Sequence, residues 1–90
     1  MLIHVNITIS GKVQKIGFRH SAMLCALENA INGFVKNLDN GKVFIETEGT
    51  QKDIETFLTW CKTGPRWAIV RDVCVENATV KNFTSFDIFS

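Results

Sequence analysis

From Ile3 to Ser10 the chain alternates strictly between apolar and polar side chains, and this pattern limits the fold more than any other feature of the sequence. The apolar positions are Ile3, Val5, Ile7 and Ile9. A period of two is typical of a β-strand that buries one face and leaves the other in water. We therefore predict a strand over Leu2–Ser10 in a sheet covered on one side only, with His4 exposed on the solvated face.

Two later segments carry the 3.6-residue period of amphipathic helices. The first runs from Ser21 to Ile31, and Gly33 after it suits a left-handed helix cap. Its apolar stripe is Met23, Ala26, Leu27, Ala30 and Ile31. The second runs from Thr50 to Lys62, opens with a capping box at Thr50-Gln-Lys-Asp53, and is stopped by Gly64-Pro65. Its apolar stripe is Ile54, Phe57, Leu58 and Cys61.

The segment between these helices predicts a β-hairpin with its turn at Asp39-Asn40-Gly41. A two-residue loop would pair Leu38 with Val43, whereas a three-residue loop would pair Asn37 with Val43 and Val35 with Ile45. We favour the three-residue loop because it places Gly41 where the backbone needs a positive φ. Asn37 then lies on the apolar face of the sheet, where a polar side chain needs a hydrogen-bond partner or a function.

Two further strands complete the sheet. Ala68–Glu76 is rich in valine and isoleucine, and Asp72 breaks its alternation and indicates a β-bulge. Phe83–Phe89 is a short last strand in which we expect Phe86 and Ile88 to point inward. The order strand–helix–strand–strand–helix–strand predicts an α+β fold, a ferredoxin-like α/β sandwich with two helices on one face of an antiparallel sheet. We expect a single domain over residues 1–90.

Composition limits the partners. The formal net charge is only +1 and the sequence pI is about 7.7, so no strong basic field favours nucleic acid or an anionic membrane. The cysteines, Cys25, Cys61 and Cys74, form no disulfide framework and no Cys-x-x-Cys pair. Neither a signal peptide nor a membrane span is evident. We therefore expect a cytoplasmic monomer with reduced thiols and with no nucleic-acid or membrane partner.

The loop from Gly11 to Arg19 is the strongest candidate for a functional site. It joins the first predicted strand to the first predicted helix. Backbone N–H groups in such a loop can converge on a phosphate, and the helix N-terminus adds partial positive charge. Arg19 adds a planar guanidinium that matches phosphate oxygens. The motifs of P-loop nucleotide hydrolases, serine hydrolases and zinc proteases are absent.

This loop, Gly11-Lys-Val-Gln-Lys-Ile-Gly-Phe-Arg19, resembles the acylphosphatase signature Gly-x-Val-Gln-Gly-Val-x-Phe-Arg. Gly33-Phe-Val-Lys-Asn37 resembles the second motif of that family, Gly-Trp-Val-Arg-Asn. Gly64-Pro65 matches the Gly-Pro that precedes the fourth strand in the family. The spacings between these blocks fit without gaps, so the resemblance covers the whole chain.

The resemblance implies an enzyme that hydrolyses the carboxyl–phosphate bond of a small-molecule acyl phosphate, giving a carboxylate and inorganic phosphate. Arg19 and Asn37 would be catalytic, with Asn37 orienting the attacking water. Because asparagine is not a general base near neutral pH, the phosphate of the substrate would accept the proton of the water. No metal or other cofactor is implied. The phosphoryl group would be held by the backbone of Gln14, Lys15, Ile16, Gly17, Phe18 and Arg19.

Lys15 is the main departure from the family pattern, because it stands where the signature has glycine. If that position needs a positive φ, a lysine costs on the order of 1–2 kcal/mol and loosens the loop. Alternatively, the charge of Lys15 attracts the anionic substrate. The sequence leaves both consequences open.

A non-catalytic βαββαβ module is the competing interpretation. Phe34 and Phe44 fall on the open face of the predicted sheet, where aromatic rings could stack on RNA bases. A domain that has lost activity could instead bind phosphate as a sensor. The first alternative predicts salt-sensitive RNA binding. The second predicts that phosphate raises the melting temperature while acyl phosphate hydrolysis stays at the uncatalysed rate.

Overall fold

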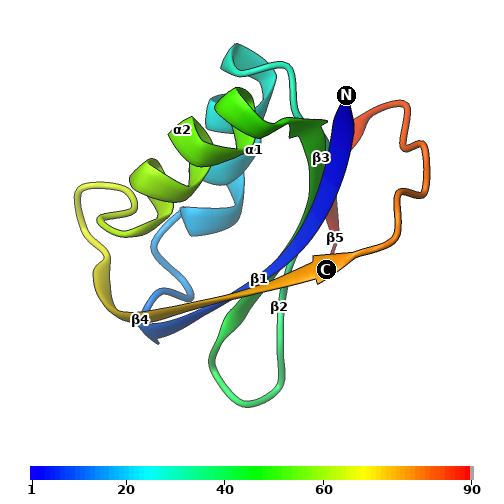
Figure 1. Ribbon diagram of the computed structural model, residues 1–90. Helices are drawn as coiled ribbons and strands as arrows, with labels where there is room; N and C mark the ends of the chain where they lie inside the picture. The colour runs from blue at the N-terminus through cyan, green and yellow to red at the C-terminus, as the bar shows by residue number, and fades with distance from the viewer. Residues whose placement is uncertain (90) are drawn as a thin grey trace.

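The computed structural model of the protein describes residues 1–89 (Figure 1). The βαββαβ order and the short additional strand are confirmed. In chain order the elements are β1 (Leu2–Lys12), α1 (Phe18–Glu28), β2 (Asn32–Asn37), β3 (Val43–Thr50), α2 (Gln51–Cys61), β4 (Ile69–Ala78) and β5 (Phe86–Phe89).

The strands form one sheet in the order β4-β1-β3-β2-β5, and both helices cover the same face of it (Figure 1). The first four strands pair antiparallel, whereas β5 runs parallel to β2. β4 and β5 lie at opposite edges, so residues 79–85 cross the sheet between them, on the face opposite the helices (Figure 1). The predicted ferredoxin-like sandwich is therefore confirmed, with β5 as a parallel strand at its edge.

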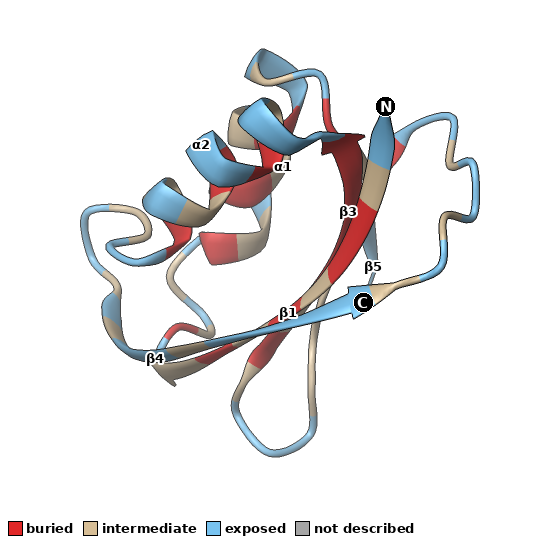
Figure 2. Cartoon of the chain, in the orientation of Figure 1, coloured by how far each residue is buried: buried red, intermediate tan, exposed pale blue. Residues whose placement is uncertain are grey.

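The hydrophobic core lies between the helices and the sheet (Figure 2). Val5, Ile7 and Ile9 are buried, which confirms the alternation predicted for β1. Strand β4 is different, because its residues are exposed or only half-buried along its whole length (Figure 2). The other fully buried apolar side chains of the strands and helices include Val35, Val43, Ile45, Ile54 and Phe57.

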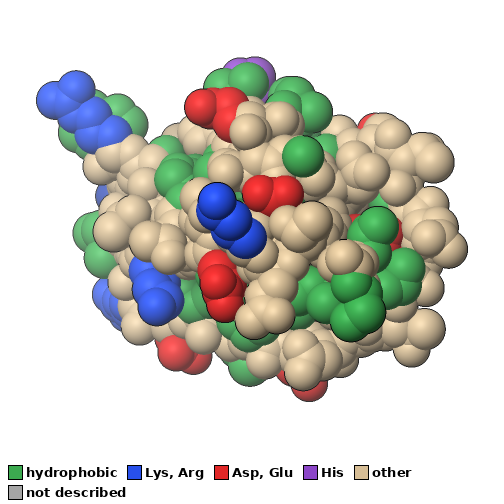
Figure 3. Space-filling view, turned by 45° about the horizontal axis from the view of Figure 1, so that its top comes forward, with side chains coloured by type: hydrophobic (Ala, Val, Ile, Leu, Met, Phe, Trp, Pro, Cys, Tyr) green, Lys and Arg blue, Asp and Glu red, His purple; other side chains and the backbone are tan. Residues whose placement is uncertain are grey.

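Charged side chains are mixed on the surface. On the face shown in Figure 3, acidic and basic groups lie singly among neutral ones, in agreement with the small net charge of the chain. This face therefore offers no large field of one sign. Within residues 1–89, neither helix has the length and apolar character needed to cross a bilayer.

The β2–β3 hairpin adopts the three-residue loop. Asn37 pairs with Val43, and Gly41 has a φ of 88°, as predicted. The Leu38 N–H donates to the Lys42 carbonyl at 2.8 Å and closes the turn. Asn37 thus lies at the end of β2 on the helix-covered face of the sheet.

Helix α2 matches its prediction closely. The Thr50 side chain caps the helix by accepting a hydrogen bond from the Asp53 N–H at 3.2 Å. The buried face consists of Ile54, Phe57 and Cys61. The helix ends at Cys61, shortly before Gly64-Pro65, as the sequence pattern indicated.

Helix α1 differs from its prediction in both start and phase. It begins at Phe18 because Gly17 takes a left-handed φ of 80° and turns the loop directly into the helix. Its buried face is the i, i+4 row of Phe18, Ala22 and Ala26, and Leu27 is 60% exposed. The predicted stripe was therefore wrong at Leu27 and at Ala30, which is exposed beyond the end of the helix at Glu28.

The predicted cap at Gly33 was also wrong. Ala30 takes the left-handed conformation after α1, with a φ of 54°. Gly33 lies within β2 instead, where a Cβ atom would collide with the backbone oxygen of Glu46. Close approach of two strands, and not a helix cap, is the reason for this glycine.

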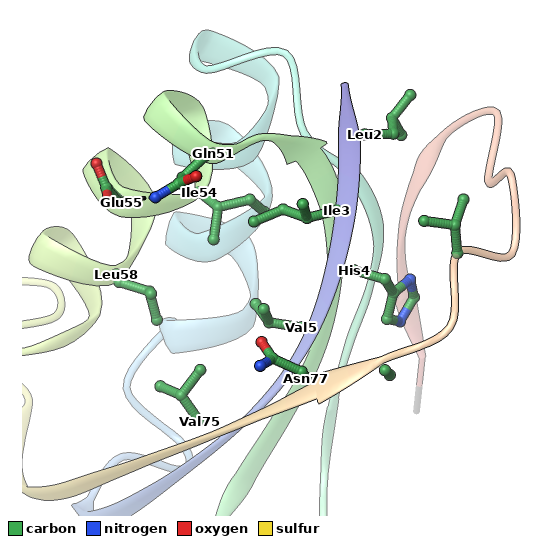
Figure 4. Close-up of a pocket in the computed structure, with 12 residues that line it drawn as sticks. Leu2, Ile3, His4, Val5, Gln51, Ile54, Glu55, Leu58, Val75 and Asn77 are labelled. Atoms are coloured by element: carbon green, nitrogen blue, oxygen red, sulfur yellow. Dashed lines mark hydrogen bonds between the residues drawn. The ribbon is translucent and has the colours of Figure 1, made fainter.

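His4 is buried, so the prediction of a surface histidine was wrong. Its ring points away from Ile3 and Val5 to the face opposite the helices (Figure 4). There the crossing segment 79–85 covers it, and the Phe83 ring lies 5.6 Å away between ring centroids. Nδ1 is 2.8 Å from Glu48 and Nε2 is 2.9 Å from Glu46, so both ring nitrogens contact carboxylates.

The last two strands follow their predictions in part. Ser10 pairs with Asp72 but Gly11 pairs with Val70, so β4 has an irregularity beside Asp72, as expected. In β5, Phe86 is buried. Ile88 lies on the same face, paired with the buried Val35, so its inward direction was predicted correctly, but it remains 37% exposed.

Candidate active site

The loop between β1 and α1 is braced against the β2–β3 turn. The side-chain amide of Gln14 donates to the carbonyl oxygens of Leu38 at 2.8 Å and Lys42 at 2.9 Å. These bonds fix the loop relative to Asn37, the last residue of β2. The two sequence motifs are thereby held together by a side chain of the first.

Two loop residues adopt a left-handed backbone. Gly17 has a φ of 80° and Lys15 has a φ of 64°. Lys15 therefore stands at a position that favours glycine, and its backbone carries strain on the order of 1–2 kcal/mol. The sequence left open whether the position of Lys15 needs a positive φ, and the structure shows that it does.

The N-terminus of α1 opens into the loop without a protein cap. Gly17 provides no side-chain hydrogen bond, and the first turn contains no acidic residue. The first N–H groups of a helix have no partner within the helix, and the helix dipole favours an anion there. These donors are therefore available to a bound phosphate group.

Arg19 lies in this first turn and is half-buried. Its Nη1 donates to the carbonyl oxygen of Phe89 in β5 at 2.9 Å. A guanidinium has five N–H donors, so this single bond orients the group and leaves donors for a ligand. Arg19 thus connects the helix start to the far edge of the sheet.

Asn37 keeps its Oδ1 atom buried, with no hydrogen-bond partner among residues 1–89. A buried acceptor without a partner costs about 1–3 kcal/mol, and native proteins contain few of them. The sequence predicted that a polar group at this position needs a partner or a function. Within the described protein it has no partner.

Arg19 and Asn37 line the same pocket, which has a volume of about 210 Å³. Among the predicted phosphate-binding residues, Gln14 and Ile16 do not line it, because Gln14 faces the hairpin turn and Ile16 packs against the core. The lining residues are Val13, Lys15, Gly17, Phe18, Arg19, His20, Asn37 and Ile88.

Three lining residues were not among the predicted site residues, and one of them, Val13, lies within the loop motif itself. His20 directly follows the loop motif, so its adjacency to Arg19 was the available signal. Ile88 comes from β5 and reaches the site only because β5 pairs with β2. No local pattern in the sequence announces that pairing.

A larger concavity of about 550 Å³ lies between α2, β1 and β4 (Figure 4). Its polar pair, Gln51 and Glu55, is engaged in a mutual contact of 3.3 Å. None of its lining residues is a lysine or an arginine, so it does not suit a phosphate group. Apolar side chains dominate it, among them Ile3, Val5, Ile54, Leu58 and Val75.

The buried thiol of Cys61 and the half-buried thiol of Cys25 are poor nucleophiles near neutral pH. Burial raises the pKa of the Cys61 thiol far above its ordinary value, and burial followed by the charge of Glu28 raises the pKa of Cys25. Within residues 1–89, no three His, Cys, Asp or Glu side chains are grouped to hold a metal ion.

Comparisons with known proteins all point to one family. The family model described as Acylphosphatase matches residues 5–88. An acylphosphatase of Archaeoglobus fulgidus is 40% identical over 87 residues, which cover 97% of this chain and 98% of that protein. An acylphosphatase of Trichormus variabilis is 36% identical, covering 97% of this chain and 86% of its own.

A solved structure gives the same result. The acylphosphatase from Bacillus subtilis superposes with a TM-score of 0.95 at 31% identity and covers all of both chains. The acylphosphatase from Coxiella burnetii also has a TM-score of 0.95, at 33% identity, covering 98% of this chain and 93% of that one. By sequence and by fold, the chain belongs to the acylphosphatase family.

Proposed function

We propose that this protein hydrolyses the carboxyl–phosphate bond of acyl phosphates, with Arg19 and Asn37 as its catalytic residues. One observation carries the assignment of residues. The unpartnered Oδ1 of Asn37 lies in the same pocket as Arg19 and the uncapped N-terminus of α1. Hydrogen-bond donors are needed to hold the phosphoryl oxygens, and a free acceptor is needed to hold a water molecule next to them.

In this proposal the phosphoryl group binds at the start of α1. Arg19 and the backbone N–H groups from Gln14 to Arg19 donate hydrogen bonds to its oxygens. Charge on these oxygens is spread further in the transition state, so fixed donors lower the barrier. The carboxylate of an acyl phosphate is a good leaving group and needs no strong acid.

Asn37 accepts a hydrogen bond from the attacking water through Oδ1 and holds it in line with the phosphorus. The water oxygen forms a bond to phosphorus, the bond between phosphorus and the acyl oxygen breaks, and its electron pair leaves on the carboxylate. A phosphoryl oxygen takes the proton of the water. The products are a carboxylate and inorganic phosphate, and we propose that neither a metal ion nor another cofactor takes part.

The competing roles receive less support. Phe34, the strongest candidate for stacking on RNA, already packs on Phe89 at 4.8 Å and near Phe44 and Phe83 at 6.1 Å between centroids. The Lys36 ammonium lies 5.9 Å from the same ring. We propose a monomer that binds small molecules and no nucleic acid.

Hydrolysis of benzoyl phosphate, followed with and without a chelating agent, tests this function. The proposal predicts turnover that EDTA does not reduce. A phosphate-induced rise in melting temperature combined with hydrolysis at the uncatalysed rate would identify a phosphate-binding module instead. Turnover abolished by EDTA and restored by a divalent metal would contradict the metal-independent mechanism.

A further inference from the structure

The pocket that contains Arg19 and Asn37 has more basic side chains than a phosphoryl group requires. Lys15, Arg19 and His20 line it, and no aspartate or glutamate does. A phosphoryl group carries about two negative charges near neutral pH. Arg19 and the helix N-terminus already complement that charge. Lys15 and His20 therefore remain for some other part of the substrate.

Lys15 has no acidic partner in the described protein. The ion pairs within residues 1–89 involve only His4, Glu46, Glu48 and Lys81. Both Lys15 and His20 are exposed, whereas Arg19 is half-buried, so the two stand at the outer rim of the pocket. Basic side chains at the rim meet the portion of a ligand that projects out of the phosphoryl site.

The backbone of Lys15 gives a second, independent indication. The residue holds a left-handed φ of 64°, which glycine would adopt without strain. Its neighbour Gln14 is anchored at two carbonyl oxygens, so the strained conformation is fixed by its surroundings. Strained residues that persist in this way cluster at functional sites.

The remaining walls of the pocket suit a hydrocarbon chain. Val13, Phe18 and Ile88 line the pocket; Val13 and Phe18 are buried, and Ile88, 37% exposed, offers most of the accessible apolar surface. A short acyl chain can follow this surface from the phosphoryl group to the rim. An anionic group at the far end of that chain would meet Lys15 and an N–H of His20.

We propose that Lys15 and His20 form a second anion-binding element at the rim of the pocket. The preferred substrates are then acyl phosphates that carry another anionic group, such as a carboxylate, on the acyl part. This inference rests on the proposed acyl phosphate hydrolysis. It assigns a specificity role to the lysine that replaces the glycine of the family signature.

Succinyl phosphate and butyryl phosphate test it, because they have four carbons each and differ in the terminal carboxylate. We expect the wild-type kcat/KM to be about threefold to tenfold higher for succinyl phosphate at low salt, the range for an exposed charge contact with Lys15 and a hydrogen bond from His20. Raising the salt concentration should reduce this ratio, since exposed charges are screened. The ratio is the readout because it cancels losses that both substrates share.

The variants K15Q and H20Q, alone and combined, complete the test. In the double variant we expect the ratio to fall to about one. K52Q is the control, because it removes the same charge as K15Q from the exposed face of α2, and it should keep the wild-type ratio. A wild-type ratio near one, or a ratio that survives the double substitution, overturns the inference. Failure to hydrolyse either substrate would instead contradict the proposed function itself.

Discussion

Asn37 carries a cost in stability that its packing does not explain. Its buried Oδ1 lacks a partner in the described protein, at the end of a strand whose inner positions are otherwise apolar. A side chain selected for packing would not leave that acceptor unpaired. The proposed water supplies the missing hydrogen bond only when the site works.

The substitution Asn37→Ala should therefore separate activity from stability. We expect kcat to fall at least ~10²-fold, the scale for losing one group that acts in the transition state. The free energy of unfolding should stay unchanged or rise by up to about 1 kcal/mol, because an unpaired buried oxygen is removed. Kinetics and urea denaturation measure the two effects.

Asn77→Ala is the matched control, since Asn77 is exposed on β4. It should change neither quantity. An Asn37→Ala variant that is clearly less stable but keeps its activity would show that Asn37 is structural.

Lys15 destabilises the fold through its backbone conformation. Its φ of 64° is the conformation that glycine adopts freely. We expect Lys15→Gly to raise the free energy of unfolding by about 0.5–1 kcal/mol, after the greater entropy of unfolded glycine offsets part of the relieved strain. Thermal denaturation should show a rise of a few degrees.

Lys52→Gly provides the contrast, because Lys52 lies in α2, where glycine costs about 1 kcal/mol. The two substitutions should thus shift the melting temperature in opposite directions. If Lys15→Gly destabilises the protein as well, the left-handed backbone at Lys15 is not strained.

At the scale of elements, the crossing segment 79–85 is held to the sheet by one carboxylate. Glu48 accepts hydrogen bonds from the backbone N–H groups of Lys81, Asn82 and Phe83 and from His4. Burial by itself would raise the pKa of Glu48, but these hydrogen bonds outweigh it and lower the pKa below its usual range. Glu48 therefore stabilises the fold in its ionised form.

A lowered pKa sets the direction of the pH dependence. The unfolded protein binds the proton of Glu48 at higher pH than the folded protein does, so the stabilisation is complete above the unfolded pKa, about 4.3, and is lost as the pH falls through the folded value. We expect Glu48→Gln to reduce the free energy of unfolding by about 2–4 kcal/mol at pH 7.

The loss of unfolding free energy in Glu48→Gln should shrink as the pH approaches 3. Urea denaturation at several pH values measures this loss. Glu55→Gln, on the exposed face of α2, should cost less than about 0.5 kcal/mol at every pH. A Glu48→Gln loss that does not depend on pH would contradict the role of the ionised carboxylate.

Local signals predicted some elements and not others, for physical reasons. The capping box of α2 and the glycine of the hairpin turn are short-range features, so the sequence determined them correctly. The start of α1 depends on the left-handed backbone of Gly17. The helix therefore begins at Phe18 and buries a different face from the one that the apolar spacing suggested. The burial of His4 depends on a segment more than seventy residues away that carries no periodic pattern.

At the scale of the whole molecule, the candidate site is assembled from three distant parts of the chain. The loop and α1 provide Arg19, the hairpin provides Asn37, and β5 provides Ile88 and the carbonyl oxygen of Phe89. The motifs identified the first two parts from the sequence. The third could not be predicted, because it depends on the parallel pairing of β5 with β2 at the sheet edge.

The central claim is that Arg19 binds the phosphoryl group during hydrolysis. Its most direct test compares kcat/KM for benzoyl phosphate, in the presence of EDTA, between wild type, Arg19→Ala and Arg71→Ala. Arg71 is an exposed arginine of β4, outside the pocket, and controls for the loss of a positive charge. We predict a decrease of at least ~10²-fold for Arg19→Ala and none for Arg71→Ala. Turnover at the wild-type rate by a folded Arg19→Ala protein would contradict the account.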